Sequence, residues 1–149
     1  MRSRAARGFS LFELAVVATI FAILVGVLLQ RVGFYQDEAE RAAVERTIGS
    51  LRAALANQQA ALALHGGEER LAALLVANPV VWLLQPPSNY LGEYYAPKPG
   101  QIKPGSWYFD PGAKTLVYQP TRDQDRLRYQ VRFVPPSRRS LDILRLDGQ

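Results

Sequence analysis

Hydrophobic residues are distributed very unevenly along this chain of 149 residues. From Phe9 to Leu29 the sequence is almost entirely apolar, and its single charged residue is Glu13. At a helical rise of about 1.5 Å per residue, these roughly 21 residues span about 31 Å, which matches the hydrocarbon core of a bilayer. The pattern therefore predicts a transmembrane helix near the N-terminus.

The helical pattern continues beyond this apolar run. Residues 37–64 are rich in Ala, Glu, Arg, Gln and Leu, which favour helix, and Gly49 is a weak interruption. The larger apolar residues recur at helical spacing and predict a narrow stripe that packs on a globular head. They are Val44, Ile48, Leu51, Leu55 and Leu62. The sequence His65-Gly66-Gly67 predicts the end of this helix, because glycine accepts the left-handed backbone of a C-terminal cap.

Shorter elements are predicted after the glycines. We expect a short amphipathic helix over 68–77, a second helical turn N-capped by Asn78 ahead of Pro79, and a Pro- and Gly-rich loop over 86–105. Strand patterns follow, and the turn Asp110-Pro111-Gly112 joins the first two into a hairpin. The strand segments are 107–109, 115–118, 127–133 and 141–146. The expected fold class is α+β, with the long N-terminal helix packed on a small antiparallel sheet.

The charge of the N-terminal leader predicts the membrane orientation. The leader carries Arg2, Arg4 and Arg7 without an acid, so the positive-inside rule places the N-terminus in the cytoplasm and the head outside. The formal net charge of the whole chain is +5, and these three arginines contribute much of it. The chain has no Cys, which excludes a disulfide and thiolate chemistry.

Glu13 is the first candidate for a functional residue. A carboxylate at membrane depth costs about 2.5 to 3.5 kcal/mol on insertion scales, so a partner or a special role is expected to offset that cost. The alternative is that Glu13 is a polar residue that faces a helix bundle in an ordinary single-pass anchor.

The stretch Gly8-Phe9-Ser10-Leu11-Phe12-Glu13 resembles the start of type IV pilins and type II secretion pseudopilins. The basic leader, the Gly-Phe junction, the Glu and the uninterrupted apolar run all agree with that family. Ser10 stands where Thr is commoner, and Gln30 stands where many pilins have a helix-kinking Pro. These departures and the lack of Cys favour a pseudopilin or a minor pilin, MSHA-like pili included, over a major fibre subunit.

The resemblance implies a maturation pathway and a set of partners. A prepilin peptidase would cleave between Gly8 and Phe9, Phe9 would be N-methylated, and Glu13 would pair with the N-terminal amine of a neighbouring subunit. The partners implied are the prepilin peptidase/methyltransferase, other pilin or pseudopilin subunits and an inner-membrane assembly platform. The protein would reside in the bacterial inner membrane with a periplasmic head, and then in a pilus or pseudopilus.

These expectations divide the chain into four segments. Residues 1–8 form the basic leader peptide, and residues 9–29 form the transmembrane and assembly helix. Residues 30–65 continue this helix into the periplasm, and residues 66–149 form the globular head.

Two other function classes stay open. One is an adhesion or DNA-uptake pilin whose head binds a ligand, and the other is an unrelated single-pass periplasmic protein. We expect no enzyme and no cofactor, since the sequence shows no phosphate loop, no metal-ligand spacing and no Ser-His-Asp set. His65, the only histidine, is expected to be a solvent-facing residue at the helix end. We expect no calcium site either, because Asp123, Asp125 and Asp142 are scattered among arginines.

The head also carries many basic and aromatic residues. The arginines are interleaved with acids, so we expect a solvated face in preference to a nucleic-acid site. They are Arg122, Arg126, Arg128, Arg132, Arg138 and Arg139. The strand aromatics Trp107, Tyr108 and Tyr118 are expected to fill the small core, while the loop residues Tyr90, Tyr94 and Tyr95 are open to either a core or a ligand role.

Overall fold

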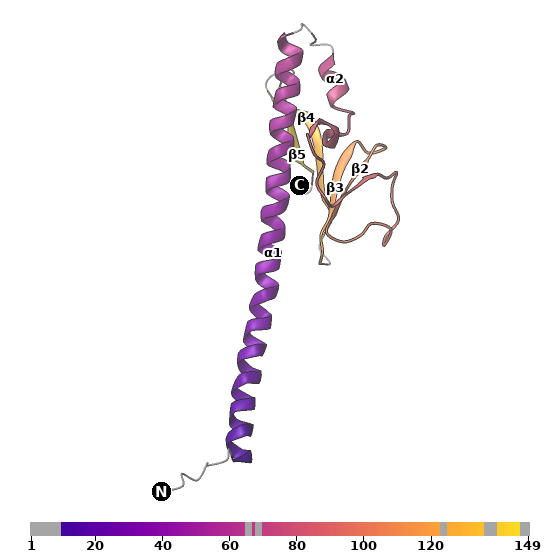
Figure 1. The fold of residues 1–149 in the computed structure, drawn as a ribbon. Coiled ribbons are helices and arrows are strands. Elements are labelled where there is room, and N and C mark those ends of the chain that lie inside the picture. Colours follow the sequence, from indigo (N-terminus) through magenta and orange to yellow (C-terminus); the bar gives the residue numbers. More distant parts are fainter. Residues whose placement is uncertain (1–9, 65–66, 68–69, 123–124, 136–139, 147–149) are drawn as a thin grey trace. The chain divides into compact units, whose positions relative to one another are not determined.

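The computed structural model describes residues 10–64, 67, 70–122, 125–135 and 140–146, with the side chains of residues 32–34 excepted. By its internal contacts the chain divides into two compact units, Met1–Ala42 and Ala43–Gln149. The helix α1, Leu11–Leu64, contributes residues to both units, and the second unit holds all of the other helices and strands. The fold is α+β, as the sequence predicted (Figure 1).

Helix α1 is 54 residues long. Its hydroxyl side chains bond back to the helix itself: Thr19 Oγ1 donates to the Ala15 carbonyl at 2.8 Å, and Thr47 Oγ1 donates to the Ala43 carbonyl at 3.0 Å. Such local bonds satisfy hydroxyl groups without an external partner. At the far end, the Gly67 N–H donates to the Leu62 carbonyl at 2.9 Å, which caps the helix beside the predicted stop. Of that stop signal, His65 and Gly66 lie outside the described residues.

Two short helices follow, and the first ends earlier than predicted. Helix α2 covers only Leu71–Leu74, and the Glu68 end of the predicted helix lies outside the described residues. The next element, η2, Pro79–Trp82, is a 3-10 helix whose predicted N-cap is confirmed, because Asn78 Oδ1 accepts from the Val80 N–H at 3.1 Å. The Asn78 amide also donates to the Tyr90 hydroxyl at 2.7 Å and to Glu93 Oε1 at 2.9 Å. Asn78 therefore ties η2 to the first strand.

Within the described residues the sheet has five strands, in the order β1-β2-β3-β4-β5. Strands β2, Ser106–Asp110, and β3, Thr115–Gln119, form the predicted hairpin, and the register pairs Tyr108 with Val117. Strands β4, Leu127–Phe133, and β5, Leu141–Arg145, continue the antiparallel pairing. The predicted antiparallel sheet is thus confirmed for these four strands.

The first strand corrects the sequence prediction. Strand β1, Tyr90–Glu93, lies inside the segment that the sequence assigned to a loop, and it pairs with β2 in parallel. The Trp107 N–H donates to the Asn89 carbonyl at 3.0 Å, and the Tyr94 N–H donates to the Phe109 carbonyl at 2.9 Å. The segment is short, its register is irregular and Gly92 has a φ of 105°. It therefore lacks the regular alternation by which a strand is recognised in sequence.

The main hydrophobic core lies between the C-terminal part of α1 and one face of the sheet. The predicted stripe supplies the helix side: Leu51 and Leu55 are at most 1% exposed, and Leu62 packs against the core while partly exposed. The sheet side carries the alternate residues of each strand. They include Trp107, Phe109, Leu116, Tyr118, Tyr129, Val131, Leu141 and Ile143. The predicted core role of Trp107, Tyr108 and Tyr118 is confirmed, although Tyr108 belongs to a second, smaller cluster with Ile102 and Val117.

Side chains of α1 cover the outer edge of β5, near which the last part of the helix runs in Figure 1. The Gln59 amide forms two hydrogen bonds with Leu141, donating to its carbonyl at 3.0 Å and accepting from its N–H at 2.7 Å. Arg52 donates to the Ile143 carbonyl at 3.0 Å, and its Nε lies 3.2 Å from a carboxylate oxygen of Asp142. These contacts satisfy backbone groups that an edge strand otherwise leaves open to another chain.

Candidate functional site

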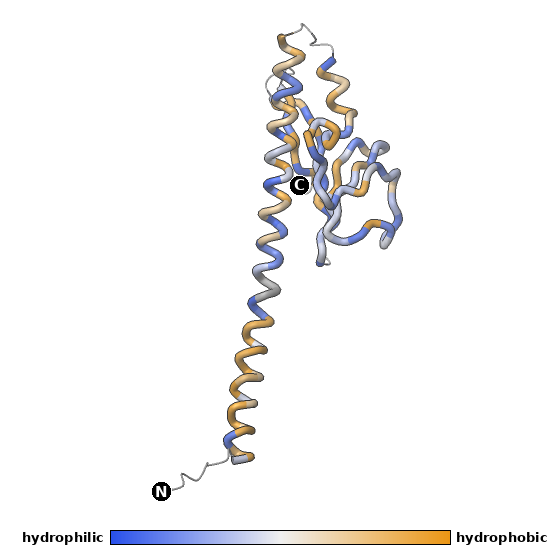
Figure 2. Tube along the Cα trace, viewed as in Figure 1, coloured by the Kyte–Doolittle hydropathy of each residue, from blue (hydrophilic) through white to orange (hydrophobic). Residues whose placement is uncertain are grey.

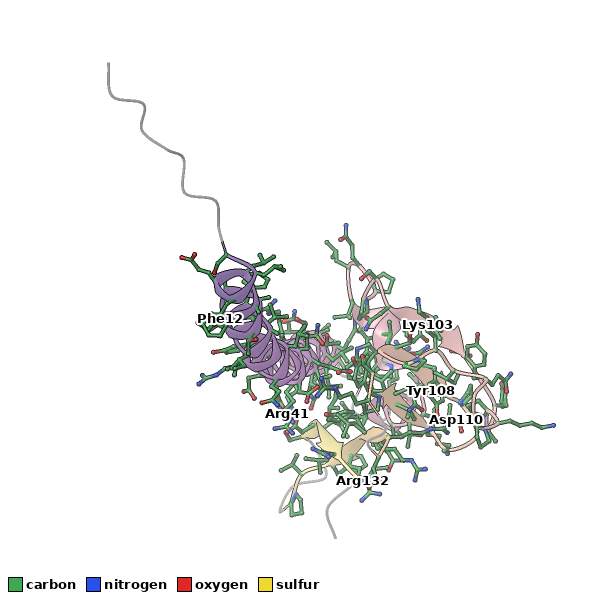
Figure 3. The ribbon with its side chains drawn as sticks, turned by 90° about the horizontal axis from the view of Figure 1, so that it is seen from below. Phe12, Arg41, Lys103, Tyr108, Asp110 and Arg132 are labelled. Atoms are coloured by element: carbon green, nitrogen blue, oxygen red, sulfur yellow. The ribbon has the colours of Figure 1, made fainter. Side chains whose placement is uncertain are left out.

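The N-terminal part of α1 has the properties expected of a membrane anchor. It contains a segment that is long and apolar enough to cross a membrane, and none of the residues in that segment is buried within the structure. Figure 2 shows it as a nearly continuous hydrophobic stretch that gives way to mixed polarity farther along α1. Large apolar side chains such as Phe12, labelled in Figure 3, and Phe21 are 78% and 67% exposed. A helix that is apolar on all sides fits a lipid environment.

Glu13 lies in the first turn of α1 and is exposed. Its backbone N–H donates to Ser10 Oγ at 3.2 Å. Ser10 is thus the N-cap of the helix, and Glu13 stands at the third helical position, which is the spacing of a capping box. This role of Ser10 was not among the predictions from sequence, although the pattern Ser-x-x-Glu ahead of an apolar run is a known signal for it.

The capping role and the membrane cost of Glu13 are separate properties. An acid in the first turn interacts favourably with the positive end of the helix dipole, typically by about 0.3 to 1 kcal/mol. That gain is smaller than the cost of about 2.5 to 3.5 kcal/mol for a carboxylate at membrane depth. Local capping therefore does not by itself offset the cost of an acid at membrane depth.

The other residues of the predicted maturation site lie outside the described residues. These are Gly8 and Phe9, the expected cleavage pair, of which Phe9 is also the expected methylation position. The structure begins one residue later, at Ser10, and the first helical residue is Leu11.

The basic residues of the head are divided between different surroundings. Arg126 and Arg128 line one hollow on the sheet, while Arg132 donates to Gln130 Oε1 at 2.8 Å beside it. Arg122 is exposed, and Arg138 and Arg139 lie outside the described residues. The arginines therefore do not gather at a single place in the part of the head that the structure describes.

The loop tyrosines take three different positions. Tyr90 is half-buried and bonded to Asn78, and burial raises the pKa of its hydroxyl against the opposing effect of that hydrogen bond. Tyr94 meets Tyr108 edge to face, with ring centroids 6.2 Å apart. Tyr95 is 75% exposed. Two of the three thus support the head, and only Tyr95 presents most of its ring to solvent.

The described acids of the head do not form a cluster that could bind a metal ion. No group of three or more His, Cys, Asp or Glu residues is placed to hold a metal ion among residues 10–64, 67, 70–122, 125–135 and 140–146. Asp142 forms an ion pair with Arg52, and Asp123 lies outside that part of the chain.

Comparison with known proteins bears on the N-terminus. The family model described as the prokaryotic N-terminal methylation motif matches residues 3–29, which include most of the leader, Glu13 and the whole apolar run. Comparison with curated proteins and with solved structures gave no match. The motif implies processing by a prepilin peptidase and assembly with other pilin subunits, and it indicates a structural subunit. This motif marks type IV pilin-like prepilins, and the chain combines it with a long N-terminal helix and a mostly antiparallel sheet.

Proposed function

We propose that this protein is a structural subunit, a pseudopilin or minor pilin, of a type II secretion or type IV pilus filament. The single observation that carries this proposal is an exposed carboxylate, Glu13, in the first turn of a membrane-length apolar helix within the methylation motif. The protein serves as the substrate of maturation enzymes and not as a catalyst.

Maturation removes residues 1–8 and leaves residues 9–149 anchored by the apolar helix. Cleavage between Gly8 and Phe9 creates a new α-amino group four residues before Glu13. Methylation of Phe9 preserves the positive charge of that amine. The basic leader holds the N-terminus in the cytoplasm, so the head enters the periplasm, and residues 30–64 carry α1 there.

Assembly follows from the charge balance at the start of the helix. A cation and an anion in a medium of low dielectric attract each other far more strongly than in water. Glu13 of one subunit therefore meets the Phe9 amine of the next, which sets the axial register between subunits. The apolar side chains between Leu11 and Leu29 then exchange lipid for neighbouring helices, on an inner-membrane assembly platform.

A set of variants separates the charge of Glu13 from its capping role. Glu13→Gln keeps a residue type that occurs in capping boxes but removes the charge, while Glu13→Ala removes both. Ser10→Ala removes the cap and leaves the charge in place. We expect both Glu13 variants to lose filament assembly and Ser10→Ala to retain it, measured by the yield of sheared filaments from cells that express each variant.

Mass spectrometry of the mature N-terminus checks the same samples, in cells with and without prepilin peptidase. We expect a chain that starts at methylated Phe9 only where the peptidase is present. Filament assembly by Glu13→Gln at the level of the parent would refute the charge pairing. A leader that is retained in the presence of the peptidase would refute the maturation step itself.

A further inference from the structure

The face of the sheet opposite α1 carries a hollow of about 470 Å³. Its walls combine residues of β2, β3 and β4 with the segment around Ala96 and Pro97. Pockets of about 300 to 1,000 Å³ are the usual size for small-molecule sites. All of these residues belong to the unit 43–149, so the hollow is a property of the head alone.

The strand register explains why these side chains share one face. Tyr108 pairs with Val117, and Val117 pairs with Arg128, which places the three side chains in a row across β2, β3 and β4. Their sequence neighbours, such as Leu116 and Tyr129, point into the main core instead. The row therefore presents a phenol, an apolar floor and a guanidinium side by side.

Arg126 is held with its guanidinium toward this row. Its Nε donates to Gln119 Oε1 at 2.8 Å, and Nη1 lies 3.5 Å from the Tyr108 hydroxyl. Within the described residues both of these partners are neutral, so neither balances the positive charge. A planar guanidinium fixed through Nε presents its remaining N–H groups as a fork, which suits the two oxygens of a carboxylate.

Among the described residues that line the hollow, one is an acid, Asp110, and backbone N–H groups bind its carboxylate. One carboxylate oxygen accepts from the N–H groups of Gly112 and Ala113 at 2.9 and 3.2 Å, and the other accepts from the Ala96 N–H at 3.3 Å. Ala96 has a left-handed backbone with φ of 42°, which a non-glycine residue adopts at a cost of about 1 to 2 kcal/mol. Asp110 thus fixes two walls of the hollow, and both of its carboxylate oxygens already accept hydrogen bonds there.

We propose that the hollow is a binding site for a ligand that carries a carboxylate on a compact, partly apolar body. The carboxylate lies against Arg126 and Arg128, and the body rests on Val117 and Pro97. Among the described lining residues, Arg126 has neutral hydrogen-bond partners and the carboxylate of Asp110 is taken up by backbone N–H groups, so the site favours an anion.

The Tyr108 hydroxyl supports the same ligand. Burial raises the pKa of this phenol, with the nearby guanidinium of Arg126 opposing the shift. The hydroxyl is therefore neutral at physiological pH and is able to donate a hydrogen bond to an anion. The inference is independent of the filament role, because the site uses no residue of the apolar helix.

The test uses the full chain, isotope-labelled in detergent micelles, and follows backbone amide signals on titration with four probes. Glucuronate represents an acidic sugar and the α-amide of N-acetylglutamate an acidic amino-acid side chain, while glucose and the α-amide of N-acetylglutamine, which carry no carboxylate, are their neutral counterparts. We expect saturable shifts at Ala96, Ala113 and Thr115 with at least one acid and none with its neutral counterpart. The acid that binds more tightly identifies the source of the ligand.

Three variants locate the interaction. Arg126→Gln and Arg128→Gln each weaken binding by about tenfold or more, since each removes a charge-assisted contact. Arg132→Gln, on the same face of β4 but outside the hollow, leaves binding within about twofold. Unchanged signals from core residues such as Leu116 and Val131 confirm that each variant is folded. Failure of both acids to bind, equal binding of a neutral counterpart, or an equal loss in Arg132→Gln overturns the proposal.

Discussion

The double hydrogen bond between Gln59 and Leu141 makes a sharp prediction for the stability of the head. Gln59→Ala removes both bonds, and it leaves the N–H and the C=O of a residue that is only 4% exposed without these partners. The adjacent Gln58 is exposed, so Gln58→Ala makes the same chemical change on the same helix. The effect of Ala on helix propensity is therefore matched between the two variants.

The expected magnitude follows from the number of bonds lost. A side-chain hydrogen bond contributes about 0.5 to 1.5 kcal/mol net, so the loss of two lowers the free energy of unfolding by about 2 kcal/mol. With a urea dependence of about 1 to 3 kcal/mol per molar, this shift lowers the midpoint of unfolding by about 1 M. Gln58→Ala is expected to leave the midpoint within about 0.3 M, because surface substitutions usually change stability by less than 0.5 kcal/mol.

The assay is urea unfolding of the full chain in detergent micelles, followed by the fluorescence of Trp107, which is 2% exposed in the core of the head. Hydrogen exchange of the Leu141 amide provides a second, local readout, and we expect faster exchange in Gln59→Ala. Equal midpoints for the two variants, together with unchanged exchange at Leu141, would refute the idea that α1 stabilises the edge of β5.

Further substitutions test the packing of the helix and two glycines. Leu51→Ala, at a position with no exposed surface, is expected to lower the free energy of unfolding by about 2 to 5 kcal/mol, while Leu64→Ala, at an 84% exposed position of the same helix, changes it little. Urea midpoints for the pair measure the difference, and equal values would contradict the burial of Leu51. Gly49→Ala is expected to stabilise by about 0.5 to 1 kcal/mol, because Gly49 lies inside α1 and a Cβ there meets nothing within 4 Å. Gly105→Ala is expected to lower the melting temperature, because its φ is 73° and a Cβ would stand 3.1 Å from Thr121 Oγ1; a rise in that temperature would contradict the assigned backbone.

Local patterns were sufficient to predict much of the fold. The helical stripe that includes Ile48, Leu51 and Leu55 is a periodic signal within one segment, and all three residues are buried as expected. Strands β2 and β3 are joined by a short turn, so the hairpin is also predictable from residues that are close together in sequence. Strand β1 was missed because its partner β2 follows it in parallel, so no tight turn marks the pairing, and its own pattern is interrupted at Gly92.

The candidate sites also differ in how far the sequence alone predicts them. Glu13 stands out from sequence because an acid in an apolar run is visible without any knowledge of its neighbours in space. The hollow on the sheet gave no such signal. From sequence, Arg126 and Arg128 were expected to be solvated arginines, and only the strand register shows that Arg128 lies in line with Tyr108. The spacing of Ser10 and Glu13 is itself a local signal for the N-cap that the structure shows at Ser10.

The sequence by itself determined the membrane-length helix, the methylation motif and the α+β class, because each depends on residues that are close together along the chain. Only the tertiary structure decided the parallel strand β1, the hollow on the sheet and the cover over the edge of β5. The two bonds between Gln59 and Leu141, for example, join residues 82 positions apart. Such contacts depend on how separate elements pack, and no local periodicity encodes them.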